Sequence, residues 1–296
     1  MMLNLQRIVR KRIVRIVVFV MVVLFPMPVH ADKIGWPQNI RIGFVPAIGQ
    51  DTHDYHRPLT EHLKKNLGTE VVTVSGKDYA GVIKALVYKQ IEFAYLGPKS
   101  YIEAKEQTEI EPLVMELGKD GKPGYYSLII SKKGSGIDTI ESAKGKSFAF
   151  TDPNSTSGYL VPTVMFVRDL HIDLKTYFKS VIFSGSHADS IRGVREGRIE
   201  VAATNTFDMY QLQERKEISE QDFNILKKSE IIPGSPVCAR KDLPESLKTA
   251  FQNAMLSFKD NQNALKTMYV GGFVKTDDKT YDVIRELERY RKQIRK

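Results

Sequence analysis

Three consecutive hydroxyl side chains form the stretch of this sequence best suited to bind a ligand. Ser155, Thr156 and Ser157 lie in DPNSTSGYLVP, residues 152–162, and Gly158 follows them. The stretch joins a strand-like run to a helix-like run, so its first N–H groups have no intrahelical acceptor. Hydroxyl and N–H donors at the positive end of a helix suit a tetrahedral oxyanion. Because one hydroxyl is enough for an N-cap, the spacing favours anion binding over capping alone.

Three ring side chains could extend such a site. His187 follows a predicted strand and begins a predicted helix, where its ring can donate to an oxyanion beside free N–H groups. Tyr79 begins another predicted helix, and Tyr125 lies near a predicted crossing between two halves of the chain. Taken singly, a capping histidine and half-buried tyrosines are the better interpretation. Only their combination with the hydroxyl stretch points to one binding site.

Other chemistries have weaker sequence patterns. His53 and His56 lack the cysteines or carboxylates of a recognisable metal-binding spacing, and the hydroxyl stretch lacks the Gly-Lys-Ser/Thr of a nucleotide-binding loop. It also differs from the Gly-x-Ser-x-Gly and Ser-x-x-Lys patterns of serine hydrolases. A secreted hydrolase that uses Ser155 or Ser157 with His187 stays open as a minor alternative. We expect no catalytic residue, metal or cofactor.

Strand and helix patterns alternate through the first part of the chain, where Tyr79 lies. Alternating apolar residues predict the strands, and apolar residues three or four apart predict the helices. The strands are predicted at 39–45, 70–74 and 91–97, and the helices at 57–67, 78–90 and 98–107. Alternation at this spacing is typical of a mostly parallel α/β sheet.

A second α/β run positions the hydroxyl stretch and His187. Its strands are predicted at 125–133, 147–150, 180–185 and 199–205. Its helices are predicted from the hydroxyl stretch to about residue 170, and at 186–197 and 206–215. Beyond residue 240 the chain becomes helical, with helices predicted at 244–258, 260–269 and 279–293.

These runs predict a bilobed α/β fold with a hinge and two mixed, mostly parallel sheets flanked by helices. Lobe one is expected to comprise 33–126 plus 236–296, and lobe two 127–235. Ligands bind at the carboxyl ends of strands in such sheets. Two sets of strand ends could therefore face one cleft.

Residues 1–31 have the pattern of a secretory signal peptide. Five Lys or Arg residues without an acid precede an apolar run that ends in Val29-His30-Ala31. The alternative is a membrane anchor, but the apolar run of about 14 residues is shorter than the about 20 that span a bilayer. We expect export to a bacterial periplasm with cleavage after Ala31. No lipid is expected there, because no cysteine is near.

Charge and cysteine content narrow the class of the exported protein. The chain has a net charge of +9, and loss of the five basic residues of the leader leaves +4. The mature chain also lacks a dense basic stripe with interleaved aromatic residues, so we expect no nucleic-acid partner. The single Cys238 leaves no internal disulfide. Folding must then rely on a large core, in which we expect Cys238 to be buried.

Several motifs together resemble the periplasmic phosphate, phosphite and phosphonate-binding proteins of ABC importers. In order along the chain, over roughly residues 40–250, they are DYAGVI, GKPGYYSLI, DPNSTSGYLVP, SGSHADSIRGVREGRIEVAATN and IPGSPV. The resemblance implies a type II periplasmic binding protein, whose two lobes close on a ligand, with an ABC permease as partner. A receptor that docks on a membrane sensor kinase stays open as an alternative use of the same fold.

The resemblance also implies roles for individual residues. The hydroxyls of 155–157, the backbone at Gly158 and the ring of His187 would hold the phosphorus-bound oxygens. Tyr79 and Tyr125 would contact the same ligand from lobe one and from the hinge. The ligand would be a small phosphorus oxyanion.

Two positions depart from relatives that bind aminoalkyl phosphonates. Those relatives place acids near the ligand amine, where this chain has Phe207 and Ser235, and Asp208 lies one residue from the first position. A buried ammonium without a carboxylate is costly. We therefore expect no preference for 2-aminoethylphosphonate. A small or apolar substituent is expected instead, as in phosphite or methylphosphonate.

Overall fold

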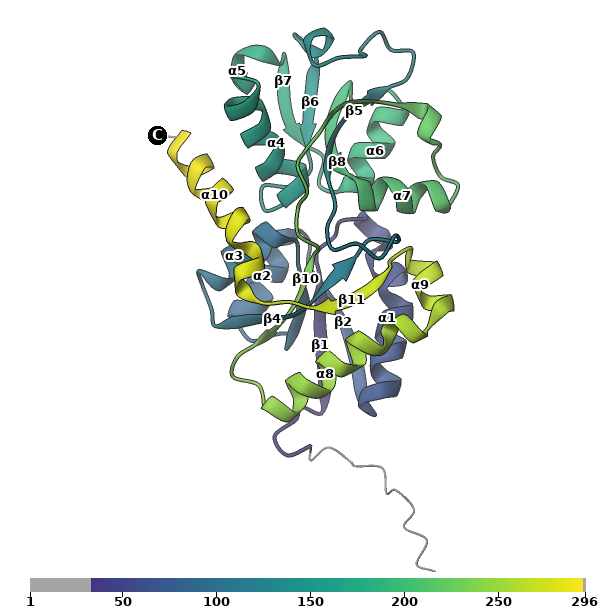
Figure 1. The fold of residues 1–296 in the computed structure, drawn as a ribbon, viewed down its shortest axis with the longest axis vertical. Coiled ribbons are helices and arrows are strands. Elements are labelled where there is room, and N and C mark those ends of the chain that lie inside the picture. The colour runs from purple at the N-terminus through teal and green to yellow at the C-terminus, as the bar shows by residue number, and fades with distance from the viewer. Residues whose placement is uncertain (1–32, 295–296) are drawn as a thin grey trace, which may run out of the picture. The chain divides into compact units, whose positions relative to one another are not determined.

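The computed structural model describes residues 33–294 (Figure 1). The predicted signal peptide, residues 1–31, lies outside the described residues. Among residues 33–294, no helix is both long and apolar enough to cross a membrane. These residues form two α/β lobes, each built on its own sheet.

Lobe one carries a six-stranded sheet with the strand order β11-β4-β10-β3-β1-β2. Its strands are β1 (Asn39–Phe44), β2 (Glu70–Ser75), β3 (Phe93–Tyr95), β4 (Ile110–Leu117), β10 (Pro236–Arg240) and β11 (Gly272–Lys275). Only β1 with β2 and β1 with β3 pair in parallel. Its helices are α1 (Thr52–Leu67), α2 (Tyr79–Val87), α3 (Pro98–Lys105), α8 (Glu245–Ser257), α9 (Gln262–Met268) and α10 (Asp282–Ile294).

Lobe two carries a five-stranded sheet with the strand order β7-β6-β8-β5-β9. Its strands are β5 (Ser127–Lys132), β6 (Ser147–Phe150), β7 (Ser180–Phe183), β8 (Val201–Asn205) and β9 (Phe223–Lys228). The helix after β6 combines α4 (Val161–Val164) with two π-helical turns, η3 (Thr156–Leu160) and η4 (Met165–Asp169). The other helices are α5 (Leu174–Tyr177), α6 (His187–Arg195) and α7 (Thr206–Glu214).

The sheets are mixed, as predicted, but antiparallel pairs outnumber parallel ones. Among residues 33–294, four strand pairings are parallel and five are antiparallel. Four strands, β4, β9, β10 and β11, have no counterpart in our prediction. Their sequences hide the strand pattern, because β4 contains Pro112, β9 ends in Lys227-Lys228, β10 begins with Pro236 and β11 has only four residues.

Helix α1 begins earlier than predicted. We predicted a helix over 57–67 from Leu59, Leu63 and Leu67, which lie four residues apart, but the helix starts at Thr52 and contains Pro58. The earlier start places Tyr55 and His56 on the helix. Both of these residues line a cavity between the lobes.

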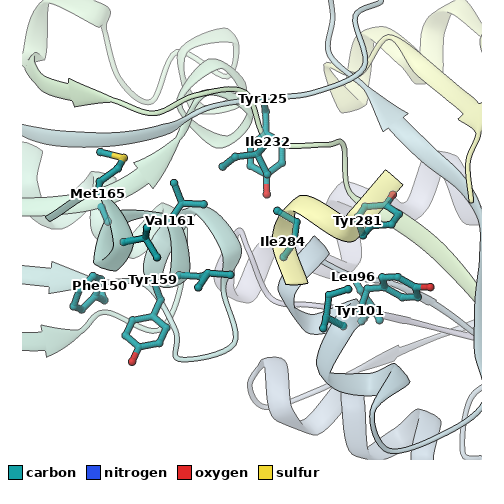
Figure 2. Close-up of a cluster of buried hydrophobic side chains, with 14 of the residues drawn as sticks. Leu96, Tyr101, Tyr125, Phe150, Tyr159, Val161, Met165, Ile232, Tyr281 and Ile284 are labelled. Carbon is teal, nitrogen blue, oxygen red and sulfur yellow. The ribbon is translucent and has the colours of Figure 1, made fainter. Parts of the chain in front are cut away.

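Two antiparallel segments join the lobes, one between β4 and β5 and the other between β9 and β10. They pair at Tyr125 and Ile232 through two backbone hydrogen bonds with N···O distances of 2.9 and 2.8 Å. Beside this crossing, a buried apolar cluster combines side chains from both lobes, including Tyr101, Tyr159 and Ile284 (Figure 2). Helix α10 reaches across as well, and contacts α3 of lobe one and α4 of lobe two.

Each lobe also has an apolar core of its own. One cluster in lobe one lies between its sheet and helices α1 and α8, and one in lobe two combines its sheet with α6 and α7. Cys238 on β10 has no exposed surface and packs in the cluster at the crossing. The prediction that Cys238 is buried is therefore confirmed.

Candidate functional site

A cavity of about 90 Å³ lies between the lobes. It is several times larger than the roughly 10–15 Å³ that one water molecule needs, so it suits a small solute. It opens at the carboxyl ends of parallel strands β1, β3, β6 and β8, where α/β sheets bind ligands. Eight of the nine predicted site residues line it: Tyr79, Tyr125, Ser155, Thr156, Ser157, His187, Phe207 and Ser235.

The hydroxyl row at 155–157 begins the helical segment that follows β6. Ser155 is the N-cap of η3, and its Oγ accepts the Gly158 N–H at 3.0 Å. Tyr79 and Tyr125 line the cavity beside this row. A π-helical turn is frequent at functional sites, and here it carries the row into the cavity. Capping and presentation of the hydroxyls are thus combined in one segment.

His187 begins α6 and faces this row. Its Nε2 is 3.2 Å from Ser155 Oγ and 3.4 Å from Ser157 Oγ, and its Nδ1 is 3.3 Å from Thr204 Oγ1. Its backbone N–H donates to Ala47 O of lobe one at 2.9 Å. Burial lowers the pKa of the His187 ring to about 3, so the ring is neutral near pH 7. When the Thr204 or Thr151 hydroxyl donates to Nδ1, Nε2 carries the hydrogen and can donate into the cavity.

Gly158 does not present its backbone to the cavity as we expected. Its N–H already donates to Ser155 Oγ, and Gly158 is absent from the cavity lining. A Cβ at this position would lie 2.0 Å from Thr151 Oγ1 and 2.3 Å from Thr151 Cβ. The glycine is needed because the end of β6 and the start of η3 approach each other closely.

Direct contacts between the lobes enclose the cavity. The Lys99 N–H of α3 donates to Thr156 Oγ1 at 2.8 Å, so a residue of the hydroxyl row also binds the opposite lobe. Asp51, which precedes α1, has its Oδ2 3.2 Å from guanidinium nitrogens of both Arg192 and Arg215 in lobe two. These contacts hold the two walls of the cavity together.

Two buried carboxyl groups also line the cavity. Glu116 on β4 and Asp208 in the first turn of α7 have exposed fractions of only 8% and 7%. Phe207 and Ser235 do line it, but Asp208 lines it as well, and Glu116 comes from a strand that we did not predict. The available signal was an acid within the apolar run at 110–117.

Aromatic residues form a second group that sequence reasoning missed. Tyr55 and His56 from α1 and Tyr95 from β3 line the cavity. The His56 ring stacks on Phe44 with centroids 3.9 Å apart, and its Nδ1 is 2.7 Å from Thr52 O. Burial lowers the pKa of His56 to about 3. Within the described range 33–294, no group of three His, Cys, Asp or Glu residues could hold a metal ion.

The stability of the ligand-free protein is expected to fall as the pH rises from 6.5 to 8.5. Burial raises the pKa of Glu116 to about 8 and that of Asp208 to about 7. The folded state then binds more protons than the unfolded state, so this stabilisation is complete below about pH 4 and is lost as the pH rises through 7 and 8. Urea denaturation should show the free energy of unfolding decreasing by about 1–2 kcal/mol over this range.

The histidines do not mask this effect. The pKa values of His56 and His187 are lowered in the folded protein, so their stabilisation is lost only as the pH falls below about 6.5. The double variant Glu116→Gln/Asp208→Asn is the matched control and should flatten the profile above pH 6.5. A variant whose stability declines as steeply as the wild type would place the titration on other groups.

A known protein family matches most of the chain. The family described as ABC transporter, phosphonate, periplasmic substrate-binding protein matches residues 42–281. A phosphonates-binding periplasmic protein of Escherichia coli K12 is 27% identical over 236 residues, which cover 78% of this chain and 69% of that protein. A phosphate-import protein PhnD of Mycolicibacterium smegmatis is 28% identical over 234 residues, which cover 73% and 72% of the two chains.

Solved structures have the same fold. A binding-protein component of an ABC phosphonate transporter from Pseudomonas aeruginosa has a TM-score of 0.80 and 28% identity, with 86% of both chains covered. PhnD1 from Prochlorococcus marinus, solved with methylphosphonate, has a TM-score of 0.77 and 22% identity, with 86% of this chain and 98% of that chain covered. These likenesses confirm the predicted bilobed fold of a type II periplasmic binding protein. The chain therefore belongs to the phosphonate family of periplasmic substrate-binding proteins of ABC transporters.

Proposed function

We propose that this protein captures a phosphorus oxyanion, such as a phosphonate, phosphite or phosphate, between its lobes and delivers it to an ABC permease. The observation that carries the proposal is the convergence of donors on one buried cavity: three hydroxyls, one neutral imidazole and two phenols. Hydrogen bonds to a charged acceptor are the stronger kind. The relatives described above are named for binding phosphonates or importing phosphate, which supports this class of ligand.

Each donor has a proposed role. Ser155, Thr156 and Ser157 donate to the phosphorus-bound oxygens, and His187 Nε2 donates from the opposite wall. Tyr79 and Tyr125, which line the cavity together with the hydroxyl row, turn their hydroxyls to the same oxygens. The site then holds the anion by neutral donors alone, as preorganised dipoles can.

We also propose how the lobes divide. Residues 33–126 with 236–296 would move as one lobe, and 127–235 as the other, because the strands of each sheet fall within these ranges. The paired segments at Tyr125 and Ile232 would act as the hinge. Domain closure around a ligand is a common property of bilobed binding proteins.

We also propose that the protein is exported to the periplasm. The family is periplasmic, and the basic and apolar leader at 1–31 supports removal of a signal peptide after Ala31. Sequencing the N-terminus of the protein recovered from the periplasm would test this. An intact leader on the recovered protein would instead support a membrane anchor.

Neither alternative has a specific observation in its favour. The relatives are transport proteins, which favours a permease over a sensor kinase as partner. For a hydrolase, His187 would need a carboxylate at Nδ1 to stabilise an imidazolium. Its Nδ1 contacts the hydroxyls of Thr204 and Thr151 instead. These contacts suit a neutral donor rather than a catalytic base.

Calorimetry on the mature protein tests the proposal. The panel is phosphate, phosphite, methylphosphonate and 2-aminoethylphosphonate, with sulfate as the control anion. We expect at least one phosphorus compound to bind with a Kd in the micromolar range or below, and sulfate to bind much more weakly. If none of the four binds at millimolar concentration, the proposed function is wrong.

A further inference from the structure

The segment between β1 and α1 in lobe one contacts helix α6 of lobe two at both ends of that helix. At the start of α6, the N–H groups of His187 and Ala188 donate to Ala47 O, with N···O distances of 2.9 and 3.3 Å. In the last turn of α6, Arg192 Nη2 lies 3.2 Å from Asp51 Oδ2. Two separate contacts along one helix therefore join the lobes.

Asp51 uses its carboxylate to contact lobe two rather than to cap its own helix. It is the N-cap residue of α1, but among the described residues its side chain makes no capping hydrogen bond. Aspartate is favoured at an N-cap because its carboxylate can accept the first N–H groups of a helix. Here Oδ2 instead lies 3.2 Å from the Nη2 atoms of both Arg192 and Arg215. The position of this acid is therefore explained by the opposite lobe.

The partners of Asp51 belong to a group of three charged side chains in lobe two. Glu217 Oε2 lies 2.7 Å from Arg192 Nη2, and Glu217 Oε1 lies 2.8 Å from Arg215 Nε. Arginine stays protonated in proteins, so two cations and one anion leave this group with one positive charge. All three side chains belong to lobe two and would stay together if the lobes separated. Closure adds the charge of Asp51, which neutralises the group.

These four side chains lie outside the cavity between the lobes. Within residues 33–294, the residues that line the cavity include none of them. Between 29% and 40% of each side chain is exposed, so water and salt reach the group. Ion pairs with this exposure contribute modestly and weaken as the ionic strength rises. An effect of Asp51 on binding would therefore act through the position of the lobes and not through contact with the ligand.

We propose that Asp51 is an electrostatic latch, which stabilises the contact between the lobes and raises the affinity for each ligand by the same factor. A ligand that needs the closed form binds in proportion to the population of that form. Asp51 is thus a positioning residue, which acts on the ligand only through Arg192 and Arg215. The effect on affinity rests on the proposed function, whereas the effect on the lobes needs no ligand.

Amide hydrogen exchange of the ligand-free protein tests the latch directly. The His187 amide donates to Ala47 O of the opposite lobe, while the Asp189 amide donates to Ser186 Oγ within lobe two. Separation of the lobes therefore exposes the His187 amide and leaves the Asp189 amide protected. Asp51→Asn should speed exchange at His187 at least about threefold, as expected for two half-exposed ion pairs, and leave exchange at Asp189 unchanged.

Salt and a matched variant separate the latch from other causes. Relative to Asp189, exchange at His187 in the wild type should accelerate as the salt rises from about 50 mM to about 1 M, whereas Asp51→Asn should respond little. Asp54→Asn is the control, because it removes the same charge from the start of α1, but its side chain is 79% exposed and lies beside His53. Unchanged exchange at His187 in Asp51→Asn, or equal acceleration at Asp189, overturns the latch.

Calorimetry then measures the effect on binding. Asp51→Asn should weaken the binding of phosphate, phosphite and methylphosphonate by the same factor, about threefold to tenfold, and Asp54→Asn should weaken none of them. A loss confined to one compound would mean that Asp51 acts on the ligand itself, and the latch would be wrong. If the wild type binds no phosphorus compound of the panel described above, the proposed function is wrong, while hydrogen exchange still decides the latch.

Glu217→Gln should change binding in the opposite direction. Removal of this carboxylate leaves two positive charges facing Asp51, so exchange at His187 should slow and the same compounds should bind at least about twofold more tightly. The same substitution combined with Asp51→Asn should produce neither change. Weaker binding by Glu217→Gln would overturn the inference that net charge drives the latch.

Discussion

His187→Ala is expected to lower the affinity for the oxyanion by about 10- to 100-fold, because a hydrogen bond to a charged acceptor contributes about 1.5–3 kcal/mol. The ring lies between the hydroxyl row and Thr204, and its Nε2 is 3.2 Å from Ser155 Oγ. The ring is 3% exposed, so water replaces its hydrogen bond poorly. Titration calorimetry with 2-aminoethylphosphonate and with methylphosphonate measures the loss for two substituents.

The His187 effect should be nearly independent of pH between 6 and 8. Burial lowers the pKa of the ring to about 3, so its neutral N–H is the donor throughout this range. His53→Ala is the matched control, because His53 lies on the exposed start of α1 with 64% of its side chain exposed. A thermal melt should show that His187→Ala is folded. Unchanged affinity in a folded variant would remove His187 from the site.

Gly158→Ala should destabilise the protein by about 3 kcal/mol, the upper end of the range for an overpacked core. The new Cβ would lie 2.0 Å from Thr151 Oγ1, and Thr151 has no exposed surface toward which to move. The Thr151 N–H also donates to Gly158 O at 3.0 Å, so the backbone would have to shift with the side chain. Urea denaturation of the ligand-free protein measures the loss in free energy of unfolding.

Gly81→Ala is the control for this substitution. Gly81 lies on α2, and a Cβ there would meet its nearest atom, Asp78 Oδ1, at an ordinary contact distance of 3.4 Å. Alanine is the better helix former by about 1 kcal/mol, so this variant should be as stable as the wild type or more so. Wild-type stability in Gly158→Ala would show that Thr151 and η3 repack easily, contrary to the close approach described above.

The grouping of the hydroxyl row with His187 and Tyr79 was predictable because its signals are local. Ser155, His187 and Tyr79 each lie where a strand gives way to a helix, and capping residues and apolar periodicity mark these junctions within a few residues. The lobes followed from the same alternation of strands and helices. We inferred strand pairing only from this local alternation, and not from contacts between residues far apart in the sequence.

The position of Glu116 in the cavity was not predictable in the same way. Glu116 reaches the cavity because β4 pairs with β10, a strand more than one hundred residues further along the chain, and no local pattern encodes that pairing. The misplaced start of α1 had a local cause, since the leucine spacing that we used marks only the part of the helix from Leu59 onward. Gly158 was assigned to the ligand because its partner Thr151 can be recognised only in three dimensions.

The bond between Lys99 and Thr156 has a consequence for delivery. A hydroxyl has a single hydrogen, and the Lys99 N–H occupies a lone pair of Thr156 Oγ1, which leaves that hydrogen for the ligand. If the lobes separate, the Lys99 N–H no longer fixes the orientation of the Thr156 hydroxyl. The lobe-one wall of the cavity is lost at the same time. Separation of the lobes would then itself lower the affinity for the ligand. A permease that holds the open form would thereby set the direction of transfer, without acting on the ligand itself.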